Sequence, residues 1–238
     1  RRVVARRLEQ VPNQARSLLG MAAVIGRTID LGLLAALAPD ADLERWAAQC
    51  VEASVLERTS EGTRFAHGKL REGVLAELAE QEQRRLSLLV ARAIERGPAD
   101  RVDRYSLLAH HFGKAGAREQ EALYAALSGE QAVRSFAIAE GKALLSRALD
   151  LTEETSETAS RRARLHRLLG EVSHYEGRFE QSLSHLTCTL SRLGVRVPVS
   201  RFDWVLLLLR QMFIQFLLYT GLIRPARASE SAALDANE

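Results

Sequence analysis

Apolar residues recur every three or four positions over most of this chain, the pattern of helices that bury one face. Between residues 42 and 51 the residues that share one face are Leu43, Trp46, Ala47, Cys50 and Val51. The spacing predicts a helix there, and similar patterns predict helices over residues 12–26, 30–37, 69–80, 82–95 and 102–114. We therefore expect a mainly α-helical chain.

The period of the apolar residues changes between the third and fourth of these helices. Residues 55–59 and 63–66 read as two short strands around a polar turn, which predicts a β-hairpin. Three helices followed by a small two-stranded wing form the winged-helix arrangement, a variant of helix-turn-helix. We expect a winged-helix domain with this small β-hairpin over residues 1–80.

Part of the helical region after the hairpin repeats. Gly170 and Ser182 are small residues that let two antiparallel helices approach closely, and Gly177 lies where the turn between them belongs. Gly129 and Gly141 hold matching places in a second, weaker copy. The pattern resembles a tetratricopeptide repeat, a helical hairpin with small residues at fixed positions. A generic pair of helical hairpins is the alternative, and either kind of hairpin stacks into an α-solenoid with a concave binding surface.

The last apolar stretch, residues 202–222, is long enough to suggest a membrane helix. Arg210, Gln211 and Gln215 interrupt it, and an arginine at the centre of a membrane helix costs about 2.5–3.5 kcal/mol on insertion scales. We therefore expect a helix covered by protein, and we do not expect a membrane partner. These features assign residues 81–195 to a helical repeat region and residues 196–238 to the hydrophobic helix with a polar tail, the start of further repeats.

Composition and charge narrow the class of protein further. The net charge is +3, and the basic clusters at residues 1–7 and 161–167 are interspersed with apolar residues, as on solvated helix faces. We therefore do not expect nucleic acid as a partner. Cys50 and Cys188 lie in apolar helical runs, which favours reduced thiols and a cytoplasmic location. We also expect the chain to be a segment of a longer protein.

Motifs for chemistry are not found in the sequence. Three Gly-Lys pairs, at residues 68–69, 113–114 and 141–142, lack the first glycine and the Ser or Thr of a phosphate-binding P-loop. His110 and His111 are adjacent in a predicted helix, so their side chains point about 100° apart and do not form a metal-binding pair. One of the two is expected to pack inside and the other to face solvent. The sequence predicts no catalytic residue, metal or cofactor in this segment, which is therefore not an enzyme by itself.

One histidine lies where the predicted hairpin passes into the next helix, in the stretch Arg64-Phe65-Ala66-His67-Gly68. Backbone N–H groups at the start of a helix attract anions, and a histidine side chain can add a further donor. His67 can therefore contact a bound anion. The alternative is that His67 only fastens the hairpin to the following helix by a hydrogen bond.

The order of several short motifs resembles a known family. The motifs are residues 22–27 (AAVIGR), 65–67 (FAH), 70–72 (LRE), 108–112 (LAHHF) and 147–151 (RALDL). Over about residues 1–195 this order is similar to the region downstream of the nucleotide-binding core in bacterial signal-transduction ATPases of the STAND class, which are related to AAA proteins. Members are often fused to serine/threonine kinase, nucleotide-cyclase or LuxR-type DNA-binding domains.

The resemblance implies a regulatory function. An upstream P-loop domain of the same chain would bind ATP or ADP, the winged-helix domain would fold back over it, and the repeats would sense a protein or small-molecule inducer. Related proteins place the histidine of a Met-His-Asp motif against the β-phosphate of ADP, and Phe65-Ala66-His67-Gly68 would occupy that place. The resemblance thus makes His67 and Arg71 candidate sensors of the nucleotide state.

Two other functions remain open. A DNA-binding winged-helix transcriptional regulator would use residues 42–54 as its recognition helix, although Glu44 and Glu52 would repel phosphates beside Arg45. A pure protein-interaction scaffold would use the repeats alone. An intact P-loop upstream in the full-length gene would separate the regulatory function from the scaffold.

Overall fold

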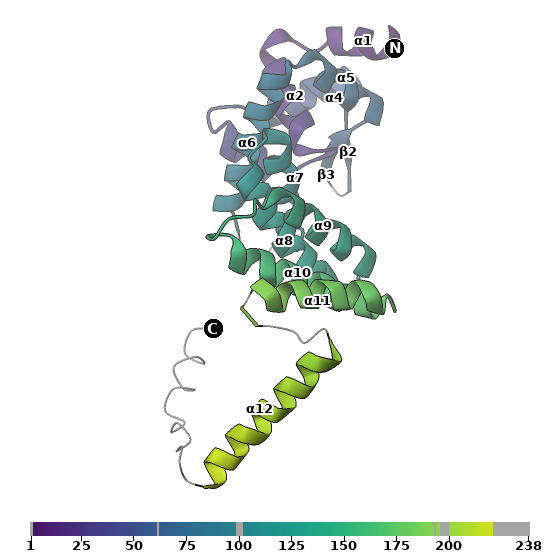
Figure 1. The fold of residues 1–238 in the computed structure, drawn as a ribbon. Coiled ribbons are helices and arrows are strands. Elements are labelled where there is room, and N and C mark those ends of the chain that lie inside the picture. Colours follow the sequence, from purple (N-terminus) through teal and green to yellow (C-terminus); the bar gives the residue numbers. More distant parts are fainter. Residues whose placement is uncertain (1, 61, 99–101, 193, 196–199, 221–238) are drawn as a thin grey trace. The chain divides into compact units, whose positions relative to one another are not determined.

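The computed structural model describes residues 2–60, 62–98, 102–192, 194–195 and 200–220 (Figure 1). Helices cover 75% of these residues, and the only sheet among them is small, three-stranded and antiparallel. The expected mainly α-helical class is confirmed. The chain forms two compact units, residues 1–189 and 190–238, and the boundaries expected at residues 80 and 195 stay a prediction.

Five helices and three strands make up the first part of the larger unit. The helices are α1 (Arg2–Glu9), α2 (Asn13–Ile25), α3 (Leu31–Leu37), α4 (Leu43–Glu52) and α5 (Gly68–Glu77). The strands are β1 (Thr28–Ile29), β2 (Leu56–Thr59) and β3 (Gly62–Phe65). Asp30 and Asp42 begin α3 and α4, because their carboxylates accept hydrogen bonds from backbone N–H groups one turn ahead.

The sheet has the strand order β1-β3-β2, with both pairs antiparallel. The expected hairpin of β2 and β3 is confirmed, with Leu56 opposite Phe65. Strand β1 was not expected, because two residues are too short to show an alternating pattern. Its pairing of Thr28 with Arg64 ties the hairpin to the loop that follows α2.

A continuous core joins the sheet to these helices. Phe65, Leu34 and Leu56 are among its fully buried side chains. Trp46 of α4 lies in the same core and donates a hydrogen bond from its indole nitrogen to the Ala15 carbonyl of α2 over 3.1 Å. Burying an indole is favourable when its N–H keeps a partner, so Trp46 fixes α4 against α2.

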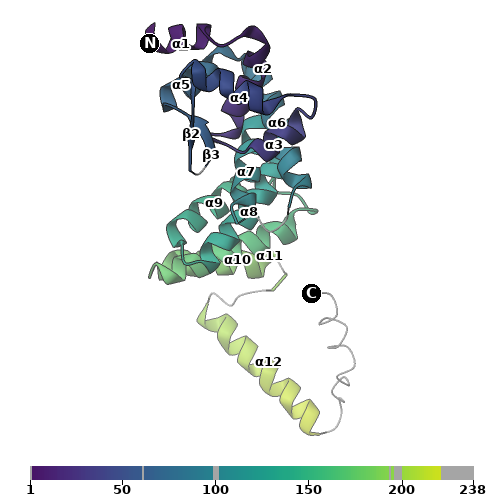
Figure 2. The same cartoon turned by 180° about the vertical axis from the view of Figure 1, so that it is seen from behind.

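Helices alone make up the rest of the larger unit. They are α6 (Glu80–Arg96), α7 (Arg104–Ala115), α8 (Arg118–Arg134), α9 (Ile138–Leu151), α10 (Ala159–Tyr175) and α11 (Phe179–Arg192). Each of α6 to α9 packs against the next helix in sequence, and two opposite views show this succession (Figures 1 and 2). Gly116 ends α7 in a left-handed conformation, and Gly177 forms the expected turn between α10 and α11.

Small residues bring these helices close together, as the sequence indicated. A Cβ atom at Gly129 would lie 2.9 Å from Leu145 of α9, and one at Gly141 would lie 2.6 Å from Val133 of α8. A Cβ atom at Gly170 would lie 3.0 Å from Leu186 of α11. The three glycines therefore allow backbone-to-side-chain contacts that alanine would disrupt.

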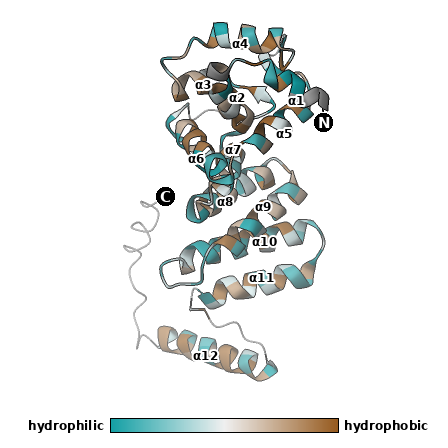
Figure 3. Ribbon diagram, turned by 90° about the horizontal axis from the view of Figure 1, so that it is seen from above, coloured by the Kyte–Doolittle hydropathy of each residue, from teal (hydrophilic) through white to brown (hydrophobic). Residues whose placement is uncertain are grey.

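The smaller unit contains one described helix of its own, α12 (Arg201–Tyr219), with a capping box between Ser200 and Asp203. None of its residues is buried, and most of the helix is hydrophobic (Figure 3). Among the described residues it is the one helix long and apolar enough to cross a membrane, by length and composition alone. Its expected burial against protein stays a prediction, and the polar tail lies outside the described residues.

Candidate functional site

His67 is exposed and occupies the N-cap of α5. Its Nδ1 atom accepts a hydrogen bond from the backbone N–H of Lys69 over 3.1 Å. The backbone just before it is fixed as well, because the N–H groups of Phe65 and Ala66 donate to the carbonyls of Arg27 and Val55. His67 therefore does fasten the hairpin to the next helix, as one of the two sequence-based alternatives requires.

The hydrogen bond of His67 also determines where its proton lies. A neutral imidazole carries one N–H and one acceptor nitrogen. Because Nδ1 accepts from Lys69, the proton belongs on Nε2. The exposed ring can thus cap α5 with one nitrogen and donate to an anion with the other, so the two alternatives for His67 are compatible.

Arg71 lies one turn further along α5 and faces α2. Its Nε atom donates to the Ala23 carbonyl over 2.7 Å. Ala23 belongs to the last turn of α2, where carbonyls have no donor within their own helix. Arg71 therefore caps the C-terminal end of α2 from α5.

A cavity of about 510 Å³ lies beside Arg71. It is lined by residues of α2, α5, α6 and α7 and by neighbouring loop residues, among them Arg71, Glu80, Arg84, His110, His111 and Lys114. His67 is not part of its wall. The structure thus separates the two predicted sensor residues, because Arg71 faces α2 and this cavity while His67 lies at the start of α5.

The two histidines of α7 differ in environment, as expected from their spacing. His111 is buried at 2% exposure, and His110 is exposed. Burial, followed by the neighbouring His110 and Arg71, lowers the pKa of His111 to about 4. Partial loss of solvent around its ring, followed by the charges of Lys114 and Arg71, also lowers the pKa of His110. No pattern in the sequence indicated that both rings line one cavity, because the other walls of this cavity come from helices distant in sequence.

The Cys50 thiol and the pair His166 and His185 lie in packed parts of the helical region and do not form a further site. Burial raises the pKa of the Cys50 thiol to about 11, so it stays protonated. His166 and His185 bring their Nδ1 atoms within 3.1 Å between α10 and α11. Among the described residues, no group of three or more His, Cys, Asp or Glu side chains could hold a metal ion.

Comparisons of the chain with protein-family models, with curated proteins and with solved structures found no match. The family resemblance and the function it implies therefore stay predictions. Support for a function comes from the residues of the chain and their geometry alone.

Proposed function

We propose that this chain is the regulatory segment of a bacterial signal-transduction ATPase of the STAND class. In this proposal a winged-helix domain couples the nucleotide state of an upstream P-loop domain to an inducer or protein partner bound by tetratricopeptide-like repeats. ATP or ADP belongs to the upstream domain, and this segment contributes no catalytic group.

The order of elements supports the winged-helix part of the proposal. Helices α2, α3 and α4 precede the β2–β3 hairpin, and β1 between α2 and α3 completes the sheet. A helix-turn-helix with a wing has this kind of arrangement. The repeat part is supported by the succession of α8 to α11, whose glycines 129, 141 and 170 permit close helix contacts.

The observation that carries the proposal is the position of His67. Its Nδ1 atom is engaged by α5, so the exposed ring can donate from Nε2. An anion at this place would meet the imidazole N–H together with the positive end of the α5 dipole. A β-phosphate of ADP, held by the upstream domain, has the charge that such a position favours. Arg71 acts in this proposal as a positioning residue, because it holds α5 against α2.

Two substitutions in the full-length protein separate the ring from the cap. His67→Ala removes both, whereas His67→Ser removes the ring and keeps a hydroxyl that caps helices well. The proposal expects both variants to lose co-purifying ADP and to raise basal output activity. If only His67→Ala changes these quantities, His67 acts as a cap alone. If neither does, the sensor function is wrong.

An observation on α11 favours the scaffold alternative as a second candidate. Phe179, Leu183 and Leu186 project from one stripe of this helix and are exposed at 65%, 65% and 38%. Such a stripe suits a further helix or a protein partner. The DNA-binding alternative gains no such support, since the acidic side chains of Glu44 and Glu52 are both exposed on α4 and Glu44 pairs with Arg58 of β2. If the chain retarded the migration of random duplex DNA at low salt, that result would support the DNA-binding alternative.

A further inference from the structure

We propose that the cavity between α5, α6 and α7 binds a small organic molecule that carries a phosphate group. This site is distinct from the start of α5, because His67 does not line it. A ligand in the cavity would therefore be separate from the nucleotide near His67, and its binding does not depend on the proposed sensor function.

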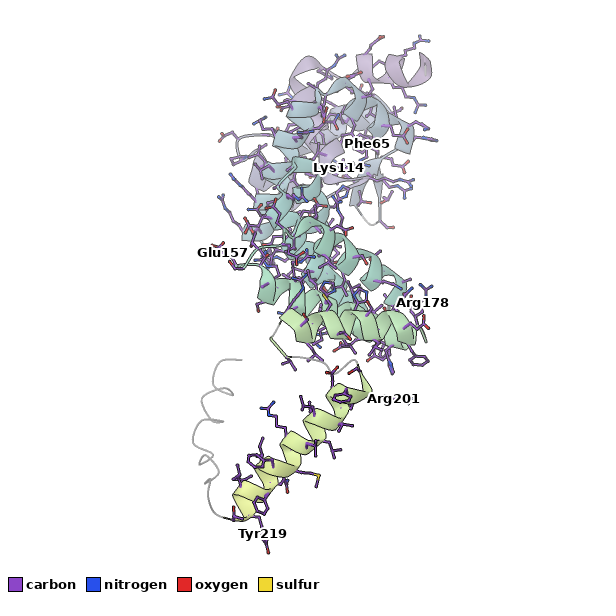
Figure 4. The ribbon with its side chains drawn as sticks, viewed as in Figure 1. Phe65, Lys114, Glu157, Arg178, Arg201 and Tyr219 are labelled. Atoms are coloured by element: carbon purple, nitrogen blue, oxygen red, sulfur yellow. The ribbon has the colours of Figure 1, made fainter. Side chains whose placement is uncertain are left out.

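The charges around the cavity favour an anion. Arg71 of α5, Arg84 of α6 and Lys114 of α7 line it, against one carboxylate, Glu80. Three cations from three helices therefore converge on one space. Lys114 is labelled on the ribbon in Figure 4.

Arg84 and Lys114 remain available to a ligand, whereas Arg71 already donates from Nε to the Ala23 carbonyl. The ion pair of Arg84 with Glu80 spans one turn of α6 at 2.6 Å, and both side chains are largely exposed. Exposed pairs of this kind contribute little and exchange partners readily. Lys114 has no ion pair among the described residues. Glu121, whose carboxylate lies near Gly113 of the wall, is already paired with Arg147 over 2.8 Å.

His111 supplies the second, independent observation. Its side chain is buried in the wall at 2% exposure, and its Nδ1 atom has no hydrogen-bond partner. A buried polar atom without a partner is costly, about 1–3 kcal/mol, and a ligand group that reached this part of the cavity wall would relieve that cost. A neutral imidazole can turn one N–H toward an anion, and His110 offers a second ring beside it.

The size and composition of the cavity indicate the class of ligand. Its volume of about 510 Å³ is in the range of small-molecule sites and exceeds what a lone ion needs. Val24 and Leu75 add apolar wall for the body of such a molecule. Guanidinium groups bind phosphate through paired hydrogen bonds, and a phosphate has three oxygens to share among several donors. A single carboxylate would leave part of this donor set unused.

The test is calorimetric titration of the purified 238-residue chain with inorganic phosphate, ribose 5-phosphate and glutarate. We expect ribose 5-phosphate to bind more tightly than inorganic phosphate and glutarate. Lys114→Gln and Arg84→Gln should each weaken its binding at least about tenfold, the loss of one charge-assisted contact. Both side chains are exposed, so these variants should keep the fold, which circular dichroism checks.

Arg85→Gln is the matched control. Arg85 is the neighbour of Arg84 on α6, but it pairs with Glu82 and does not line the cavity. Its replacement should leave binding unchanged. The proposal is overturned if no phosphate compound binds, if glutarate binds as tightly as ribose 5-phosphate, or if Arg85→Gln weakens binding as much as Arg84→Gln. His67→Ser should leave this titration unchanged, because His67 does not line the cavity. A failure of the cavity proposal therefore shows in this titration, whereas a failure of the sensor function shows in the ADP retention of the His67 variants.

Discussion

The backbone N–H of Lys69 donates to Nδ1 of His67 over 3.1 Å, so the residue that follows the β-hairpin also begins α5. One side chain thus links the only described sheet to the helix whose Arg71 holds α2. A single position can therefore affect both the stability of this region and any anion bound near it, and these two effects can be measured separately.

Removing the cap should destabilise the chain. Replacing a capping side chain by alanine costs about 0.5–2 kcal/mol, because an N–H at the helix start loses its partner. His67→Ala should therefore lower the free energy of unfolding by about 1 kcal/mol, measured by urea denaturation. His67→Ser should recover most of this loss, and equal stability of the two variants would contradict the capping role.

A methyl group at Gly141 should disturb the contact between α8 and α9. A Cβ atom there would lie 2.6 Å from Val133 Cγ2 and 3.1 Å from the Gly129 carbonyl oxygen. Gly141→Ala should cost about 1–3 kcal/mol of stability, the usual cost of overpacking. Gly68→Ala is the control, because nothing lies within 4 Å of its Cβ position, and it should leave stability unchanged or raise it slightly. Similar effects of the two substitutions would contradict the close packing.

Arg71 should stabilise the end of α2 independently of any ligand. Arg71→Ala removes the donor to the carbonyl of the buried Ala23 and should cost about 1–3 kcal/mol, the penalty for an unsatisfied polar group. Thermal unfolding of the chain without added phosphate measures this loss. Unchanged stability would show that the contact with Ala23 contributes nothing.

His111 should make the stability depend on pH. Its pKa in the folded chain is about 4, against 6.5 for an ordinary histidine, so between these values the unfolded state binds more protons. The free energy of unfolding therefore falls as pH drops from about 6.5 to about 4, by at most about 3 kcal/mol from this residue. His111→Leu should show a shallower dependence over the same window. Equal slopes for wild type and variant would contradict a buried, neutral His111.

Local patterns in the sequence were enough to predict most elements. Apolar spacing located α3 and α4, and a change of period around a polar turn located the hairpin. The glycines at 129 and 141 indicated close helices. These signals work because each depends on residues within one or two turns of each other.

Features that depend on distant residues were not predicted. Strand β1 is two residues long, and only its pairing with Arg64 and Thr63 defines it. The cavity joins Val24 to Lys114 across four helices, and no local pattern signals such a meeting. For the same reason no local pattern signals the contact of Arg71 with Ala23, 48 positions away in the chain. The expected role of Arg71 as a sensor stays a prediction.

The most direct test of the proposed function is the rate at which ADP leaves the full-length protein. Wild type and His67→Ser are loaded with a fluorescent ADP analogue and chased with unlabelled nucleotide. Since the serine keeps the cap and removes the ring, the sensor function predicts release at least about tenfold faster from the variant, the loss of one charge-assisted contact. Equal release rates from the two proteins would contradict it.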